Sequence, residues 1–151
     1  MFKYAAKWSA LLVALAMIIG GAQVAVAADK PFAEKKIVLQ ISDPNPFKQT
    51  LVLNVANNLV KEYGPDKVAI EVVAFGPGVR LLFADNANTG RIKALADNAG
   101  VTFHACSNTI ANMTKKLGEE PSINPIADKN GPGVVRIVKL VTEDGYTLVK
   151  P

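Results

Sequence analysis

The order of apolar and polar segments along the chain predicts an α/β fold. Three short runs rich in β-branched residues, at 37–41, 68–75 and 101–106, are each followed by turn-forming residues or a helix-capping sequence, which is typical of buried strands. Between the first two runs, apolar residues recur at helical spacing over 47–63, after Asn45-Pro46, which suits a helix start. A strand, a helix and a strand of these lengths form a βαβ unit, so we expect parallel strands.

Three further helical segments are expected before residue 119. A short helix is expected at 79–84, a longer one begins near Thr89, whose hydroxyl can cap it, and a third follows the run at 101–106 and ends at Gly118. The positions expected to be buried are Ile92, Leu95, Ala96 and Ala99 in the second and Ile110, Met113 and Leu117 in the third. Residues 119–130 are rich in Pro and Asn and are expected to form a loop, with a short strand around 123–126.

The C-terminal segment is compatible with two structures. Its valines and isoleucine recur at helical spacing over 134–141, but their β-branched character and the turn signal Asp144-Gly145 favour a β-hairpin. Either 134–142 pairs antiparallel with 146–149, or a helix ends by Gly145 and 146–149 forms a last strand. Periodicity alone leaves both open.

The N-terminus has the pattern of a secretory signal peptide. Lys3 and Lys7 precede an uncharged apolar run that ends in the small residues Ala25-Val26-Ala27. We expect cleavage after residue 27, a mature domain of residues 28–151 in the periplasm or another exported location, and contact with a membrane only during export. The alternative is that residues 9–28 stay in place as an N-terminal membrane anchor.

The charge of the mature chain argues against a nucleic-acid partner. All 13 acidic residues follow the predicted cleavage site, whereas two of the 17 basic residues, Lys3 and Lys7, precede it. The mature domain is therefore close to neutral, and it contains no run of Lys and Arg with interleaved aromatic residues.

Cys106, the only cysteine, is the strongest candidate for a reactive group. It lies where a predicted strand ends and a helix begins, and the free amides of a helix N-terminus stabilise a thiolate. The carboxyl ends of parallel strands are also where ligand sites form. The alternatives are a small buried hydrophobic residue or a cysteine paired with another chain.

His104, the only histidine, lies two residues before Cys106 and is expected to project from the same face of the strand. It can assist proton transfer at the sulfur, although a separation of roughly 6.5–7 Å along a strand is long for a hydrogen bond. The alternative is a polar residue that fills space beneath a helix. One Cys and one His fall short of the four ligands of structural zinc, so we expect no metal.

The turn Gly76-Pro77-Gly78 and the helix start Ser107, Asn108 and Thr109 are expected to form the rim of a ligand site around Cys106. The glycines allow the backbone to approach an anion or a neighbouring subunit; the alternative is a rigid turn with one positive φ. The turn lacks the spacing of a dinucleotide-binding loop and the Lys-Ser/Thr of a phosphate-binding loop, so we expect no cofactor.

Four segments together resemble the DsrE/DsrF-like family: 72–82 with its G-P-G turn, 105–109 with Cys106, 54–59, and 145–151. The resemblance implies a three-layer αβα sandwich with a mostly parallel sheet of about five strands, and it favours the helix over the hairpin after residue 134. It also implies a homo-oligomer such as a trimer or hexamer. For members that keep the cysteine it implies a persulfide, here on Cys106, carried from a sulfur donor protein to an acceptor.

Two functions follow as hypotheses. The first is an exported sulfur-trafficking protein of the sulfurtransferase-like kind, which passes sulfane sulfur from Cys106 to a partner thiol. The second is an oligomeric accessory or binding protein without catalysis, in which Cys106 is structural or senses redox state. A hydrolase or metal enzyme ranks last, because the sequence offers no nucleophile-base pair and no ligand set.

Overall fold

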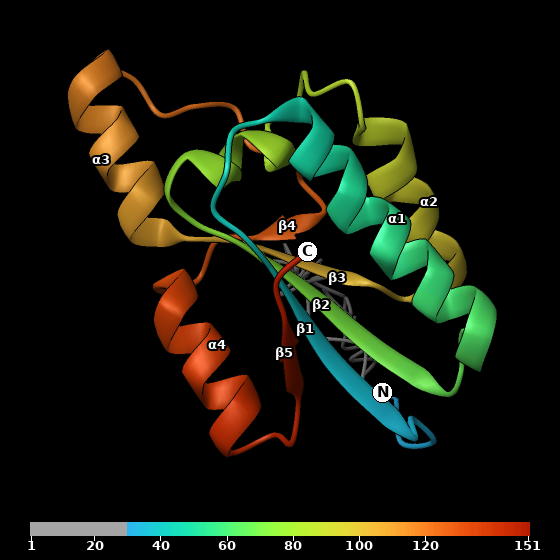
Figure 1. The fold of residues 1–151 in the computed structure, drawn as a ribbon. Helices are drawn as coiled ribbons and strands as arrows, with labels where there is room; N and C mark the ends of the chain where they lie inside the picture. Colours follow the sequence, from blue (N-terminus) through green and yellow to red (C-terminus); the bar gives the residue numbers. More distant parts are fainter. Residues whose placement is uncertain (1–29) are drawn as a thin grey trace, which may run out of the picture.

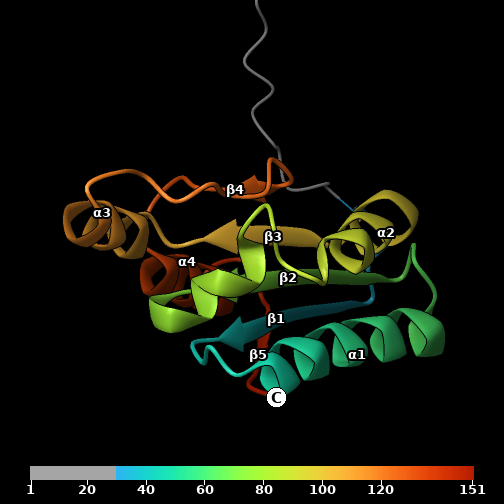
Figure 2. The same cartoon turned by 90° about the horizontal axis from the view of Figure 1, so that it is seen from above.

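Five parallel strands form one sheet in the computed structural model, which describes residues 30–151 (Figure 1). The strand order is β4-β3-β2-β1-β5, so β4 and β5 are the two edges (Figure 2). The strands are β1 (Lys35–Ile41), β2 (Val68–Ala74), β3 (Thr102–Ala105), β4 (Ala127–Asp128) and β5 (Thr147–Val149). The predicted signal peptide, residues 1–27, lies outside the described residues.

Helices cover both faces of this sheet, as expected for a three-layer α/β fold. The helices are α1 (Pro46–Tyr63), the 3₁₀ helix η1 (Gly76–Leu82), α2 (Thr89–Ala99), α3 (Ser107–Leu117) and α4 (Gly133–Thr142). Figure 1 shows α1 and α2 on one side of the sheet and α4 on the opposite side, while α3 extends beyond the carboxyl ends of the strands. Within residues 30–151, no helix has both the length and the apolar character needed to cross a bilayer.

Side chains alternate between two cores along the strands, because successive residues of a strand point to opposite faces. The larger core lies under α1 and α2 and includes Leu39, Val72 and Phe103. The smaller one lies under α4 and consists of Val38, Val73, Ile137 and Leu140. Each fully buried side chain of this size stabilises the fold by roughly 1.5–3 kcal/mol.

The first βαβ unit agrees with its prediction almost residue by residue. Asn45 is the N-cap of α1 and its side chain accepts a hydrogen bond from Phe47 N, with Pro46 in the first turn. β1 and β2 pair in parallel from Lys35 opposite Val68 to Ile41 opposite Ala74. All seven residues of β2 are buried, as the central strand of a covered parallel sheet requires.

The C-terminal segment forms the predicted helix and strand, not the hairpin. α4 ends at Thr142, and β5 pairs in parallel with β1, with Leu148 opposite Val38. A hairpin would have exposed the apolar face of the sheet that Ile137 and Leu140 now cover.

Four local predictions were wrong in detail. The helix expected at 79–84 is the 3₁₀ helix η1, which begins at Gly76, so the G-P-G turn forms its first turn. The strand expected around 123–126 is reduced to one antiparallel bridge between Ile123 and Phe83, and the strand β4 follows at Ala127–Asp128, where the chain runs beside β3. Thr89 does not cap α2, since it is the first residue of the helix and Asn88 is the N-cap; its hydroxyl donates to Asn86 O at 2.6 Å. Leu117 is 64% exposed, because α3 leaves the sheet and buries only Ile110 among its residues.

Candidate functional site

Cys106 is the N-cap of α3, at the carboxyl end of the sheet. Its amide donates to Ala74 O at 2.9 Å, which continues the pairing of β3 with β2 for one residue beyond Ala105. The chain then turns directly into α3 at Ser107. The predicted position of the cysteine, between a strand end and a helix start, is therefore the observed one.

The N-termini of two helices meet at the sulfur of Cys106. Burial, the largest influence on the pKa of this thiol, raises it. Hydrogen bonds from the Gly133 amide, the Thr109 hydroxyl and the amides of Thr109 and Asn108 lower it, and together they outweigh burial, so the pKa lies below its ordinary value. Gly133 is the first residue of α4, whereas Asn108 and Thr109 belong to the first turn of α3. The arrangement favours a thiolate.

Thr109 connects the cysteine to the G-P-G turn. Its Oγ1 accepts a hydrogen bond from Gly76 N at 2.8 Å. Because that bond occupies an acceptor site of the hydroxyl, its proton remains available for the sulfur of Cys106. Two elements of the predicted rim, residues 76–78 and 107–109, are thus brought together.

The G-P-G turn has the conformation of a rigid turn. Gly76 has a φ of +52°, which a glycine adopts readily. A Cβ at Gly78 would lie 2.5 Å from the carbonyl oxygen of Ile41 and 2.8 Å from the Cα of Ser42, so the turn packs against the end of β1. The close approach expected of these glycines is made to the chain's own backbone.

Gly133 is a site residue that the sequence analysis missed. A Cβ on Gly133 would lie 3.1 Å from the Cβ of Cys106 and 3.3 Å from the Cβ of Phe75, so glycine lets the start of α4 approach the cysteine. A signal was present: the tetrapeptide G-P-G-V occurs twice, at 76–79 and at 131–134. Both copies lie at this end of the sheet, and each provides a contact to the site.

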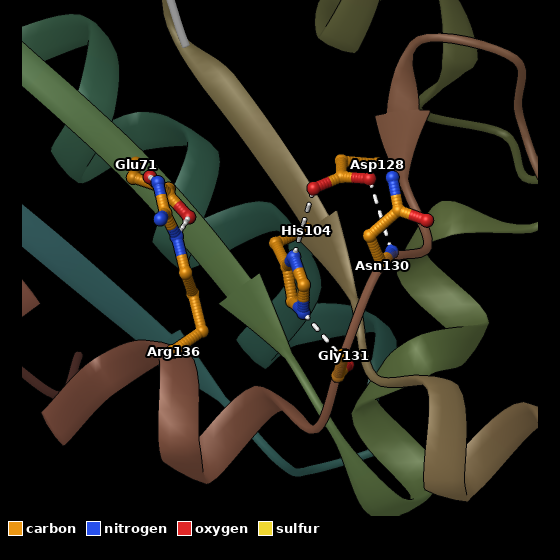
Figure 3. A network of polar contacts seen from close by, with 6 residues as sticks. All are labelled: Glu71, His104, Asp128, Asn130, Gly131 and Arg136. Carbon is orange, nitrogen blue, oxygen red and sulfur yellow. Dashed lines mark hydrogen bonds and ion pairs between the residues drawn. The ribbon is translucent and has the colours of Figure 1, made fainter. Parts of the chain in front are cut away.

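His104 is buried, with 1% of its surface exposed, and its polar partners are in the segment before α4. Its Nε2 lies 3.2 Å from Gly131 O, and its Nδ1 lies 3.5 Å from Asp128 Oδ2 (Figure 3). Its neighbour in register on β2 is Val73, which belongs to the core under α4. His104 therefore faces α4, and Cys106 is not among its polar partners in the described part of the chain.

Access to the sulfur is narrow, because Cys106 is only 6% exposed. Two surface pockets flank the first turns of α3. One of about 580 Å³ is lined in part by Gly76, Pro77 and Thr109, and one of about 490 Å³ in part by Ser107 and Ile110. Both pockets are lined by residues next to Cys106 in the fold, and Cys106 itself lines neither of them.

The donor set around Cys106 suits an anion and not a cation, since amides and a hydroxyl point at the sulfur. Among residues 30–151 there is no group of three or more His, Cys, Asp or Glu side chains arranged to hold a metal ion.

Comparison with known proteins finds no matching family model and no matching curated protein. Among solved structures, the chain is similar to the protein of unknown function MTH1491 from Methanobacterium thermoautotrophicum. The two chains are 28% identical with a TM-score of 0.67, over 78% of this chain and 99% of that one. This likeness supports the α/β fold and carries no information on activity.

Proposed function

We propose that the protein is a sulfur carrier, in which Cys106 accepts a sulfane sulfur, holds it as a persulfide and passes it to a partner thiol. The observation that carries the proposal is the convergence of the α3 and α4 N-termini on one buried sulfur, which lowers its pKa. Thiolate is the nucleophile in exchange at sulfur.

The reaction needs only the donor persulfide, the Cys106 thiolate and the acceptor thiolate. In loading, the Cys106 thiolate attacks the outer sulfur of a donor persulfide, R–S–SH; a new S–S bond forms, the donor's S–S bond breaks, and R–S⁻ leaves. In unloading, an acceptor thiolate attacks the outer sulfur on Cys106, and the Cys106 thiolate leaves. The amides of Asn108, Thr109 and Gly133 stabilise that leaving group, because each hydrogen-bonds the charged form of the sulfur.

Replacing Cys106 with serine is expected to abolish sulfur loading. Incubation of the reduced protein with a low-molecular-weight persulfide should add one sulfur atom to the wild type and none to Cys106→Ser, measured by intact-protein mass spectrometry. The variant keeps a side chain of similar shape, so its fold, checked by circular dichroism, serves as the control. Equal sulfur uptake by both proteins would contradict the proposal.

Only 6% of the surface of Cys106 is exposed, which favours a second candidate function. In it, the protein is an accessory or binding protein in which Cys106 is structural or senses redox state. The pH dependence of alkylation separates the two. Because the thiol pKa is lowered, we expect the alkylation rate of the folded protein to rise with pH, with the midpoint of the profile below pH 9.0, the ordinary pKa of a cysteine thiol. A thiol that reacts only after unfolding would identify the structural alternative; the pH-matched unfolded protein provides the reference rate.

The homo-oligomer implied by the family resemblance remains a proposal, and one surface supports it. Four valines on α4 are exposed although they are apolar: Val134, Val135, Val138 and Val141. An apolar helix face of this kind is typical of a subunit contact. Export, and the existence of a sulfur donor protein and an acceptor protein, remain predictions from the sequence.

A further inference from the structure

The segment that leads from β4 into α4 is held by His104. The ring is 1% exposed, and its nitrogens face Gly131 O at 3.2 Å and Asp128 Oδ2 at 3.5 Å. Figure 3 shows the ring between these two residues, with Asp128 on one side and Gly131 on the other. Asp128 is itself fixed, since its Oδ1 accepts from Asn130 N at 3.0 Å. The histidine thus contacts both ends of a four-residue turn.

The Gly131 carbonyl is tied to both sides of the cysteine. It accepts from His104 Nε2, two residues before Cys106, and from Ser107 N at 3.1 Å, one residue after it. Gly131 has a φ of +95°, and Pro132, the N-cap of α4, has its φ fixed by its ring. Gly133, the next residue, lies against the cysteine, since a Cβ on it would be 3.1 Å from the Cβ of Cys106, and its amide is the hydrogen-bond donor that lowers the thiol pKa most. With φ of Pro132 fixed, the position of the Gly131 carbonyl constrains where the Gly133 amide points, and ψ of Pro132 is the one backbone angle between them that stays variable.

We propose that His104 is a positioning residue for Cys106: it anchors the Gly131 carbonyl and so holds the Gly133 amide against the sulfur. The proposal rests on the proposed sulfur-carrier function for its biological meaning, but the geometry it concerns is present without any sulfur donor. It replaces the expectation that His104 exchanges protons with the thiol directly.

The hydrogen-bond partners assign the tautomer of the ring. A carbonyl oxygen only accepts, so Nε2 carries the proton in the bond to Gly131. In the neutral ring Nδ1 is then an acceptor, and it has no hydrogen-bond partner in the described structure. The charged group that faces Nδ1 is the Asp128 carboxylate; Glu71 and Arg136, drawn beside the ring in Figure 3, are bound to each other.

The test compares His104→Leu, which removes the donor, with His104→Gln, whose amide can rebuild a bond to Gly131. Alkylation of Cys106 is measured against pH on the folded full chain. The midpoint of the profile reports the thiolate, whereas the plateau reports access. Loss of one hydrogen bond to a thiolate corresponds to about a tenfold lower rate on the acid side of the midpoint. We expect this loss in His104→Leu, with the midpoint at higher pH, and recovery of most of it in His104→Gln.

Two outcomes would overturn the proposal: an unmoved midpoint in His104→Leu, or an equal shift in both variants, which would mark a packing role. If His104→Leu does not fold, ¹⁵N NMR of the wild-type imidazole decides, since a proton on Nδ1 in the neutral ring overturns the proposal and one on Nε2 supports it. Sulfur loading is measured separately. A shifted midpoint without loading would leave the positioning role in place and remove the carrier function.

Discussion

Gly78→Ala is expected to lower the free energy of unfolding by about 3 kcal/mol, near the upper end of the range for overpacking. The added Cβ would lie 2.5 Å from the carbonyl oxygen and 2.7 Å from the carbonyl carbon of Ile41, both of them backbone atoms. That oxygen also accepts from Phe75 N at 3.1 Å, so it cannot move without disturbing the end of the β1-β2 pairing. Since Thr109, whose hydroxyl lowers the pKa of Cys106, is bonded to the same turn at Gly76, we also expect the midpoint of the Cys106 alkylation profile to move to higher pH.

The measurement is chemical denaturation followed by circular dichroism, with Gly90→Ala as the matched control. Gly90 lies in the first turn of α2, and a Cβ there would meet no atom within 4 Å. Alanine is favoured over glycine in a helix by up to about 1 kcal/mol, so the control is expected to be neutral or slightly stabilising. A loss of stability below about 1 kcal/mol in Gly78→Ala would show that η1 shifts without cost, against the expectation.

Arg136→Met is the second substitution with a large expected effect. Arg136 of α4 binds both carboxylate oxygens of Glu71, with Nε to Oε1 and Nη2 to Oε2 each at 2.7 Å (Figure 3). Glu71 lies in the central strand and only 3% of its side chain is exposed. Removal of one partner leaves a buried charge without compensation, which costs about 3 kcal/mol of unfolding free energy. The Arg136 side chain is 27% exposed, which is why the low end of the usual range is expected.

A double variant and a surface control sharpen this test. Replacing both partners, Glu71→Leu with Arg136→Met, removes the buried charge together with its partner and is expected to recover most of the loss. Lys93→Met breaks the exposed pair between Lys93 and Asp97 and should change the unfolding free energy by less than about 1 kcal/mol. If Arg136→Met lowers the unfolding free energy no more than Lys93→Met does, the pair of Glu71 and Arg136 does not hold α4 to the sheet.

These two substitutions act on opposite sides of the same site. Gly78 sets how closely η1, and through it Thr109, approaches the end of the sheet. Arg136 holds α4, whose first residue donates to Cys106. The stability of the fold and the state of the thiol therefore depend on some of the same contacts.

Patterns along the chain were sufficient for the elements whose signals are local. The cap at Asn45, the proline after it and the periodicity over 47–63 predict α1, because capping and helical spacing depend on neighbours in sequence. The position of Cys106 between β3 and α3 was predictable for the same reason. Thr89 does not cap α2 because it is the first residue of the helix, one position after the N-cap Asn88. The prediction that Leu117 is buried was wrong because helical spacing does not show that a helix leaves the sheet.

By itself, the sequence determined the parallel α/β class, the strand that ends at the cysteine and the need for glycine in the turn at 76–78. Only the tertiary structure decided which groups meet the sulfur. Gly133 lies 27 residues after Cys106 along the chain, and its amide reaches the thiol because α4 packs on the face that His104 and Glu71 occupy. A hydrogen bond depends on distances of a few ångströms and on direction, and neither is encoded in the spacing of residues so far apart.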